Sequence, residues 1–194
     1  MDRKRFEITP GFAAFVCLLC CLAEGRLLLP FLLAGAAHEC GHLLVLRLLR
    51  IPVYGLTLCG TGAVLRTGIT GRPREAWAIA AGPAVNLVLA LTLFRVWPLF
   101  GLCNAVQLAW NLLPVSPLDG GRLALLLLSL LPGSTGRRLF RALQLGVLAL
   151  ALGAGIYGTC VRRMGLLPVI FAAFFLVRVS NLLDKPEDCW YNNM

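Results

Sequence analysis

Long apolar segments, separated by short polar turns, follow one another along almost the whole chain. A helix needs about 20 apolar residues to cross the hydrocarbon core of a membrane, and most of these segments are near that length. The pattern predicts an all-α polytopic membrane protein with about six transmembrane helices, at residues 11–23, 27–49, 75–94, 99–131, 140–157 and 164–183. The first segment is the shortest, and the fourth is too long for a simple span.

A short β-hairpin is predicted between the second and third spans. Apolar stretches at residues 53–58 and 63–66 flank the turn residues 59–62. Non-helical backbone is tolerated at membrane depth only where protein covers it or where it lines a wet cavity. A membrane-associated hairpin is therefore one interpretation, and a hairpin packed on the lipid headgroups is the other.

Composition agrees with a membrane protein. Hydrophobic residues make up 59% of the chain and charged residues 14%, and the mean hydropathy of +0.82 lies far from that of soluble domains. No polar stretch is long enough for a separate soluble domain, so we expect a single integral-membrane domain over residues 1–194. The N-terminal apolar run lacks a convincing cleavage site, so we interpret it as an uncleaved span.

The net charge of +9 does not indicate a nucleic-acid partner, because the basic residues are scattered at the ends of apolar segments. Positive charges near the ends of spans favour the cytoplasmic side. This rule places two groups on opposite sides: Arg3, Lys4, Arg5, Arg47, Arg50, Arg66, Arg72, Arg74, Arg137, Arg138, Arg141 and Lys185 in the cytoplasm, and Arg26, Arg95, Arg162 and Arg163 outside it. We therefore expect a multi-pass protein of the cell membrane with both termini cytoplasmic.

The only two histidines of the chain lie in the second span, in the sequence His38-Glu39-Cys40-Gly41-His42. Histidines four residues apart on a helix project from one face, so both can bind one Zn²⁺, with Glu39 placed to polarise a bound water. Ionisable side chains are costly at membrane depth and are rarely found there without a function. The motif therefore predicts a hydrolytic site with one zinc ion.

Asp119 is the best candidate for the third protein ligand that a catalytic zinc needs. Apart from Glu39 it is the only acidic residue deep in an apolar context. Pro114 and Pro117 interrupt the fourth segment, which lets a carboxylate turn inward. The alternatives are an ion pair of Asp119 with Arg122, or a cap for the helix that restarts there.

The cysteines do not add a second metal site to this prediction. Cys17, Cys20 and Cys21 lie in the middle of an apolar span, where cysteine packs as a small hydrophobic residue. Cys40 points about 100° away from its neighbour around the helix, so we do not expect it to bind the metal.

Three motifs follow one another along the chain: the His-Glu-x-Gly-His form, the Ala-Gly-Pro-Ala-Val-Asn of residues 81–86 and the Asn-x-x-Pro-x-x-Pro-x-Asp-Gly-Gly of residues 111–121. Together they resemble the site-2 protease family of intramembrane zinc metalloproteases. The resemblance runs from about residue 27 to residue 131, and the six-span layout is similar to the bacterial sporulation-type branch. Family members often carry a CBS or a PDZ domain, and we expect neither here.

The resemblance implies an enzyme, a zinc metalloendopeptidase that hydrolyses a peptide bond in or near the transmembrane segment of a membrane-anchored substrate. It implies a role for each of these residues: His38, His42 and Asp119 as zinc ligands, Glu39 as catalytic base, and Pro83, Asn86 and Asn111 as residues that bind substrate or shape the cleft. A regulatory partner in the membrane would fit this activity.

Other interpretations of the same residues are open. Asn86 could simply bond to a neighbouring helix, and the pair Gly82-Pro83 could simply start one. The chain could also be a non-catalytic relative that holds membrane proteins, against which the intact Glu39 argues. A metal transporter is the last alternative, and it would favour further buried ligands along a path, which this sequence lacks.

Overall fold

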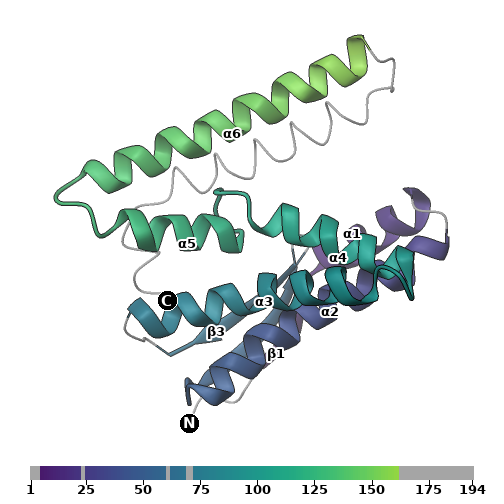
Figure 1. Cartoon of the computed structure of the whole chain (residues 1–194), viewed down its shortest axis with the longest axis horizontal. Helices are drawn as coiled ribbons and strands as arrows, with labels where there is room; N and C mark the ends of the chain where they lie inside the picture. Colours follow the sequence, from purple (N-terminus) through teal and green to yellow (C-terminus); the bar gives the residue numbers. More distant parts are fainter. Residues whose placement is uncertain (1–4, 23–24, 60–61, 69–71, 162–194) are drawn as a thin grey trace. The chain divides into compact units, whose positions relative to one another are not determined.

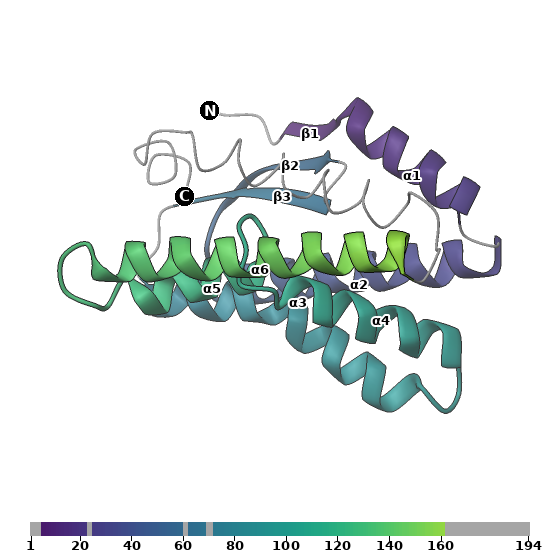
Figure 2. The same ribbon diagram turned by 90° about the horizontal axis from the view of Figure 1, so that it is seen from above.

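The computed structural model of the chain describes residues 5–22, 25–59, 62–68 and 72–161, and the sixth predicted span at residues 164–183 lies outside them. The chain divides into two compact units, with the boundary between Asn111 and Leu112. Figures 1 and 2 show the elements of both. The predicted single domain over residues 1–194 stays a prediction.

The first unit holds a small sheet and four helices. In chain order these elements are β1 (Arg5–Ile8), α1 (Pro10–Leu22), α2 (Gly25–Leu48), β2 (Val53–Cys59), β3 (Gly62–Thr67), α3 (Arg72–Leu93) and α4 (Pro98–Asn111). The second unit holds α5 (Asp119–Leu128) and α6 (Thr135–Cys160).

Helices α2, α3 and α4 pack against one another around small and apolar side chains. Ala34, Phe100 and Cys103 form a buried cluster between α2 and α4, which Leu89 and Leu93 of α3 complete. A Cβ atom at Gly41 would lie 2.8 Å from the carbonyl oxygen of Ala81. The glycine therefore allows α2 and α3 to approach closely along the face that carries the histidines.

The predicted hairpin is confirmed, and the structure adds a third strand to it. The strand order is β1-β2-β3, with β2 and β3 antiparallel and β1 parallel to β2. The hydroxyl of Thr9, just after β1, donates to the carbonyl oxygen of Leu58 at 3.0 Å. Strand β2 is therefore paired on both of its edges.

The sheet packs next to the C-terminal end of α2. Val53 of β2 and Leu65 of β3 pack on a buried cluster that includes Leu46 of α2 and Ala78 of α3. Because Leu46 follows His42 by one helical turn, the sheet is anchored next to the histidine-bearing part of α2.

Three of the described helices, α2, α3 and α6, are long and apolar enough to cross a membrane. The chain is thus mostly helical with a small sheet, but six spans are not confirmed. Helix α1 has only 13 residues, which corresponds to a length of about 20 Å. The predicted break of the fourth segment is confirmed, because α4 ends at Asn111 and α5 begins at Asp119.

One alternative interpretation of α3 is wrong. The pair Gly82-Pro83 does not start a helix but lies inside α3, which begins at Arg72. The signal of the actual start is Pro73, the second residue of α3, since proline is favoured in the first turn of a helix. Pro83 instead removes one backbone donor in the middle of the helix.

Candidate metal centre

The two histidines lie on the buried face of α2. His38 is 5% exposed and His42 8% exposed, and they share this face with Ala34, Gly41 and Leu46. The spacing of three and four residues along this face is the helical repeat that the sequence predicted. Cys40 is exposed, which agrees with its predicted direction away from the site.

A backbone carbonyl orients the His42 ring. Its Nδ1 donates a hydrogen bond of 2.7 Å to the carbonyl oxygen of Ala78 in α3. A neutral imidazole that carries its proton on Nδ1 keeps the lone pair of Nε2 for a metal. The contact between α2 and α3 thus selects the tautomer of His42 that can bind zinc through Nε2.

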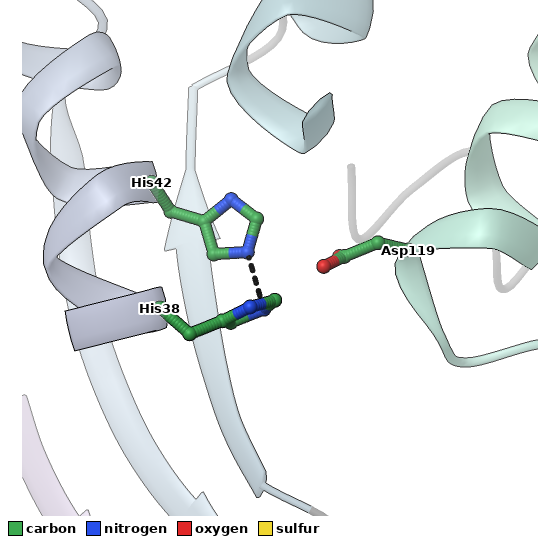
Figure 3. A group of neighbouring side chains, drawn as sticks. All are labelled: His38, His42 and Asp119. Carbon is green, nitrogen blue, oxygen red and sulfur yellow. Dashed lines mark hydrogen bonds between the residues drawn. The ribbon is translucent and has the colours of Figure 1, made fainter. Parts of the chain in front are cut away.

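The two Nε2 atoms face each other, as Figure 3 shows. They lie 3.0 Å apart, and the two rings are nearly perpendicular, at 82°. Two imidazole nitrogens that bind the same tetrahedral Zn²⁺, each at 2.0–2.1 Å, are about 3.3 Å apart. The observed separation is close to this value, so a small opening of the pair fits both nitrogens to one zinc ion.

Gly82 of α3 makes room for both rings. A Cβ atom at this position would collide with Nε2 of His42 and would lie 2.7 Å from both Cε1 and Nε2 of His38. The Nε2 atoms of His38 and His42 therefore face a position of α3 that must carry no side chain. The Gly82-Pro83 motif thus clears the site and does not begin a helix.

Asp119 is the first residue of α5 in the second unit and is 7% exposed. The N-cap of α5 is Leu118, so Asp119 does not have the capping role that was the alternative. Arg122, the suggested ion-pair partner, is exposed. The first observation argues against the cap, and the ion pair stays an alternative.

The segment before α5 folds back over the start of that helix. A Cβ atom at Gly120 would meet the carbonyl oxygen of Leu112 and would lie 2.7 Å from that of Leu113. A Cβ atom at Gly121 would lie 2.6 Å from the backbone nitrogen of Ser116. The two glycines after Asp119 therefore allow this tight packing, which fixes where α5 begins.

His38 and His42 are buried in the first unit and Asp119 is buried in the second, and all three are residues whose side chains could bind a metal ion. Two imidazoles and one carboxylate are a donor set that zinc takes in catalytic sites, with one position left for water or substrate. The chemistry of these residues thus fits zinc. Glu39, the predicted base, follows His38 on α2 and is half-buried.

The three residues predicted to bind substrate lie on α3 and α4. Pro83 and Asn86 are buried in α3, and Asn111 is the half-buried last residue of α4. The Asn86 amide nitrogen donates to Oε1 of Gln107 at 3.5 Å, which agrees with the simpler interpretation of a bond between helices. Their roles toward substrate stay predictions.

Sequence reasoning missed the parts of α3 and α4 that support the site. Ala78 acts through its carbonyl oxygen, which no side-chain pattern reveals. Gln107 and Asn104 are polar residues three apart on one face of α4 and are both buried. This spacing in an apolar segment was a signal that could have pointed to them.

The chain is similar in structure to the site-2 protease from Methanocaldococcus jannaschii. The comparison gives a TM-score of 0.66 with 19% identity and covers 87% of this chain and 86% of the other. The chain has the fold of a site-2 protease. The predicted resemblance to the site-2 protease family is therefore confirmed at the level of the fold.

Curated relatives of similar sequence carry the name of zinc metalloproteases. The chain is 33% identical over 190 residues to "Putative zinc metalloprotease Rip3" of Mycobacterium tuberculosis, which covers 84% of this chain and 48% of that protein. It is 33% identical over 137 residues to "Putative zinc metalloprotease sll0528" of Synechocystis, which covers 61% and 36%. The chain thus spans about half or less of the length of these relatives. No protein-family model matches it.

Proposed function

We propose that this protein is an intramembrane zinc metalloprotease, which hydrolyses a peptide bond in or near the transmembrane segment of a membrane-anchored protein. The observation that carries the proposal is the histidine pair of α2. Its two Nε2 atoms lie 3.0 Å apart on the buried face of a helix long enough to cross a membrane. Relatives named as zinc metalloproteases point to the same chemistry.

His38, His42 and Asp119 are the proposed ligands of one zinc ion. When bound, zinc would polarise the scissile carbonyl group and an attacking water. Glu39 takes the proton of this water and passes it to the leaving amine, as a general base and then a general acid. Hydrogen bonding of His42 Nδ1 to Ala78 keeps its ring in place during this step.

Asn111, Asn86 and Pro83 are proposed to act on the substrate side of the same site. Asn111 ends α4 immediately before the break in the fourth segment. Its side-chain amide would bond an unwound substrate strand or its developing oxyanion. Pro83 and Asn86 would shape the cleft from α3, one and four residues after Gly82.

A helical substrate hides its backbone amides in its own hydrogen bonds, so it has to unwind before it is cut. We propose that the unwound segment pairs with the outer edge of β3. Strand β2 has no edge left for a substrate, because β1 pairs with one of its edges and β3 with the other. In the described sheet, β3 is the strand of the hairpin with an edge to offer.

The proposed topology has six spans, both termini in the cytoplasm and the histidines in the cytoplasmic half of α2. It rests on the distribution of arginine and lysine between the ends of the apolar segments. A regulatory membrane partner is part of the proposal only as a class of protein.

The decisive experiment replaces Glu39 by Gln. The variant should lose cleavage and keep zinc, because the change removes the base and leaves the three ligands and nearly the same side-chain volume. The protein would be co-expressed with candidate single-span proteins, with a shortened product followed on gels and zinc measured by mass spectrometry after purification.

Glu75→Gln in the first turn of α3 is the matched control, since it makes the same chemical change at a half-buried position outside the site. It should cleave at the normal rate. Turnover retained by Glu39→Gln would overturn the proposed mechanism.

A further inference from the structure

Three carboxamide side chains are buried where α2, α3 and α4 meet, and we call them the amide cluster: Asn86, Asn104 and Gln107. Asn86 and Asn104 are fully buried, and Gln107 is 8% exposed. Buried polar groups are expensive unless each of their donors and acceptors is paired, and most acutely so inside a membrane. The hydrogen bonds of the cluster therefore need a complete account.

Backbone carbonyls fix the orientation of each amide. Gln107 Nε2 donates to the carbonyl oxygen of Phe31 in α2 at 2.8 Å, and Asn104 Nδ2 donates to that of Phe100 at 2.8 Å. A carbonyl only accepts, so the nitrogen of each amide must be the atom that faces it. Gln107 Oε1 then accepts the bond from Asn86 Nδ2.

This fixed direction leaves two oxygen atoms open. Among the described residues, Asn86 Oδ1 and Asn104 Oδ1 are buried and have no hydrogen-bond donor. Turning either amide over does not help, because it would place one acceptor against another. The Asn104 oxygen would then face the carbonyl oxygen of Phe100, and the Asn86 oxygen would face Gln107 Oε1. Each open oxygen therefore calls for a donor from outside the described residues.

The two open oxygens belong to neighbouring positions of one interface. Asn86 of α3 bonds to Gln107 of α4, and Asn104 lies one turn before Gln107 on the same face. Ala90, buried one turn after Asn86, carries only a methyl group. Small residues also face the cluster from α2, where a Cβ atom at Gly35 would lie 3.7 Å from the Gln107 amide.

We propose that the amide cluster holds a buried water molecule, which donates one hydrogen bond to Asn86 Oδ1 and the other to Asn104 Oδ1. Water has two donors, which match two acceptors and leave no charge in an apolar interior. Internal water of this kind typically bonds to otherwise unsatisfied buried groups and forms part of the structure. The inference stands apart from the proposed hydrolysis, since it concerns α3 and α4 whether or not the protein cleaves a substrate.

Radiolytic hydroxyl-radical footprinting of the purified full chain tests the proposal, because a radical formed from an internal water oxidises the side chains next to it. Phe100, whose carbonyl oxygen accepts a hydrogen bond from Asn104 Nδ2, is 8% exposed. Phe140 of α6 is 7% exposed. The two phenylalanines therefore serve as probe and matched control. We expect several-fold faster oxidation of Phe100, and equal rates would overturn the proposal.

Variants then test whether one water joins both oxygens. Asn104→Leu should lower the oxidation of Phe100 to the rate of Phe140, and Asn86→Leu should do the same. In thermal unfolding the effects of the two changes should not add, because either one removes the shared water. Asn104→Leu combined with Gln144→Leu, a buried amide of the second unit, should give additive effects.

Additive effects for the Asn86 and Asn104 pair would overturn the shared site. If Asn86→Leu fails to fold, Asn104→Leu still decides through the oxidation of Phe100. The measurements are repeated with choline chloride in place of sodium chloride. An unchanged pattern supports water, whereas protection that depends on sodium would overturn water in favour of a cation.

Discussion

Replacing Gly82 by Ala tests the geometry of the metal centre most directly. The new Cβ atom would lie 2.7 Å from His38 Nε2, which is 0.7 Å short of the 3.4 Å at which ordinary contact begins, and it would be closer still to His42 Nε2. Zinc–nitrogen bonds are reliable to about 0.2 Å around 2.0–2.1 Å. The crowding therefore exceeds what a metal site tolerates.

We expect Gly82→Ala to weaken zinc binding by about 10- to 100-fold, the range found when groups that support metal ligands are changed. Zinc retained during purification would be measured by mass spectrometry, and the affinity by competition with a chelator. The folding of α3 should not suffer from propensity, because alanine is favoured over glycine inside a helix by about 1 kcal/mol.

Two further glycines supply controls. A Cβ atom at Gly146 of α6 would meet nothing within 4 Å, so Gly146→Ala makes the same change without crowding. Gly41→Ala would press on the Ala81 carbonyl oxygen and so separates loss of helix packing from crowding of the imidazoles. Normal zinc affinity in Gly82→Ala would refute the proposed position of the ligand atoms.

Three other predictions follow from the same structure. Asp119→Ala should lower both zinc content and cleavage, whereas Arg122→Ala should change neither; a fully metallated and active Asp119→Ala would remove the carboxylate from the ligand set. Val64→Pro and Leu65→Pro alter neighbouring residues of β3, whose N–H groups point to opposite edges of the strand. One of the two should therefore reduce cleavage while zinc content and expression stay normal, because proline removes a backbone donor. Normal cleavage rates in both variants would exclude β3 as the strand that pairs with the substrate. Reporter fusions after Arg74 should report a cytoplasmic position, and an active alkaline-phosphatase fusion there would contradict the proposed topology.

Features with a local signal could be predicted from the sequence. The histidine face of α2 follows from four-residue spacing. The hairpin follows from two apolar stretches around Gly60 and Gly62, and no end of β2 or β3 differs from its predicted position by more than one residue. The break before Asp119 follows from two prolines. In each case the residues that decide the structure are close together in the chain.

Features that depend on distant partners could not be predicted. Strand β1 has four residues and takes its hydrogen bonds from β2, so no pattern in its own sequence defines it. Gly82 resembles a helix breaker when only Pro83 is considered. Its role depends on the two imidazoles across the α2–α3 interface, and the orientation of His42 depends on a backbone atom of Ala78.

The position of these groups along the chain has a consequence for the biogenesis of the protein. Both histidines, the carbonyl that orients His42 and the glycine that clears the rings lie in the consecutive helices α2 and α3. The ribosome therefore completes this pair of helices before it has made Asp119. A nascent chain that has completed α2 and α3 already holds both proposed imidazole ligands, so capture of the metal can begin during synthesis, before Asp119, the proposed third ligand, is added.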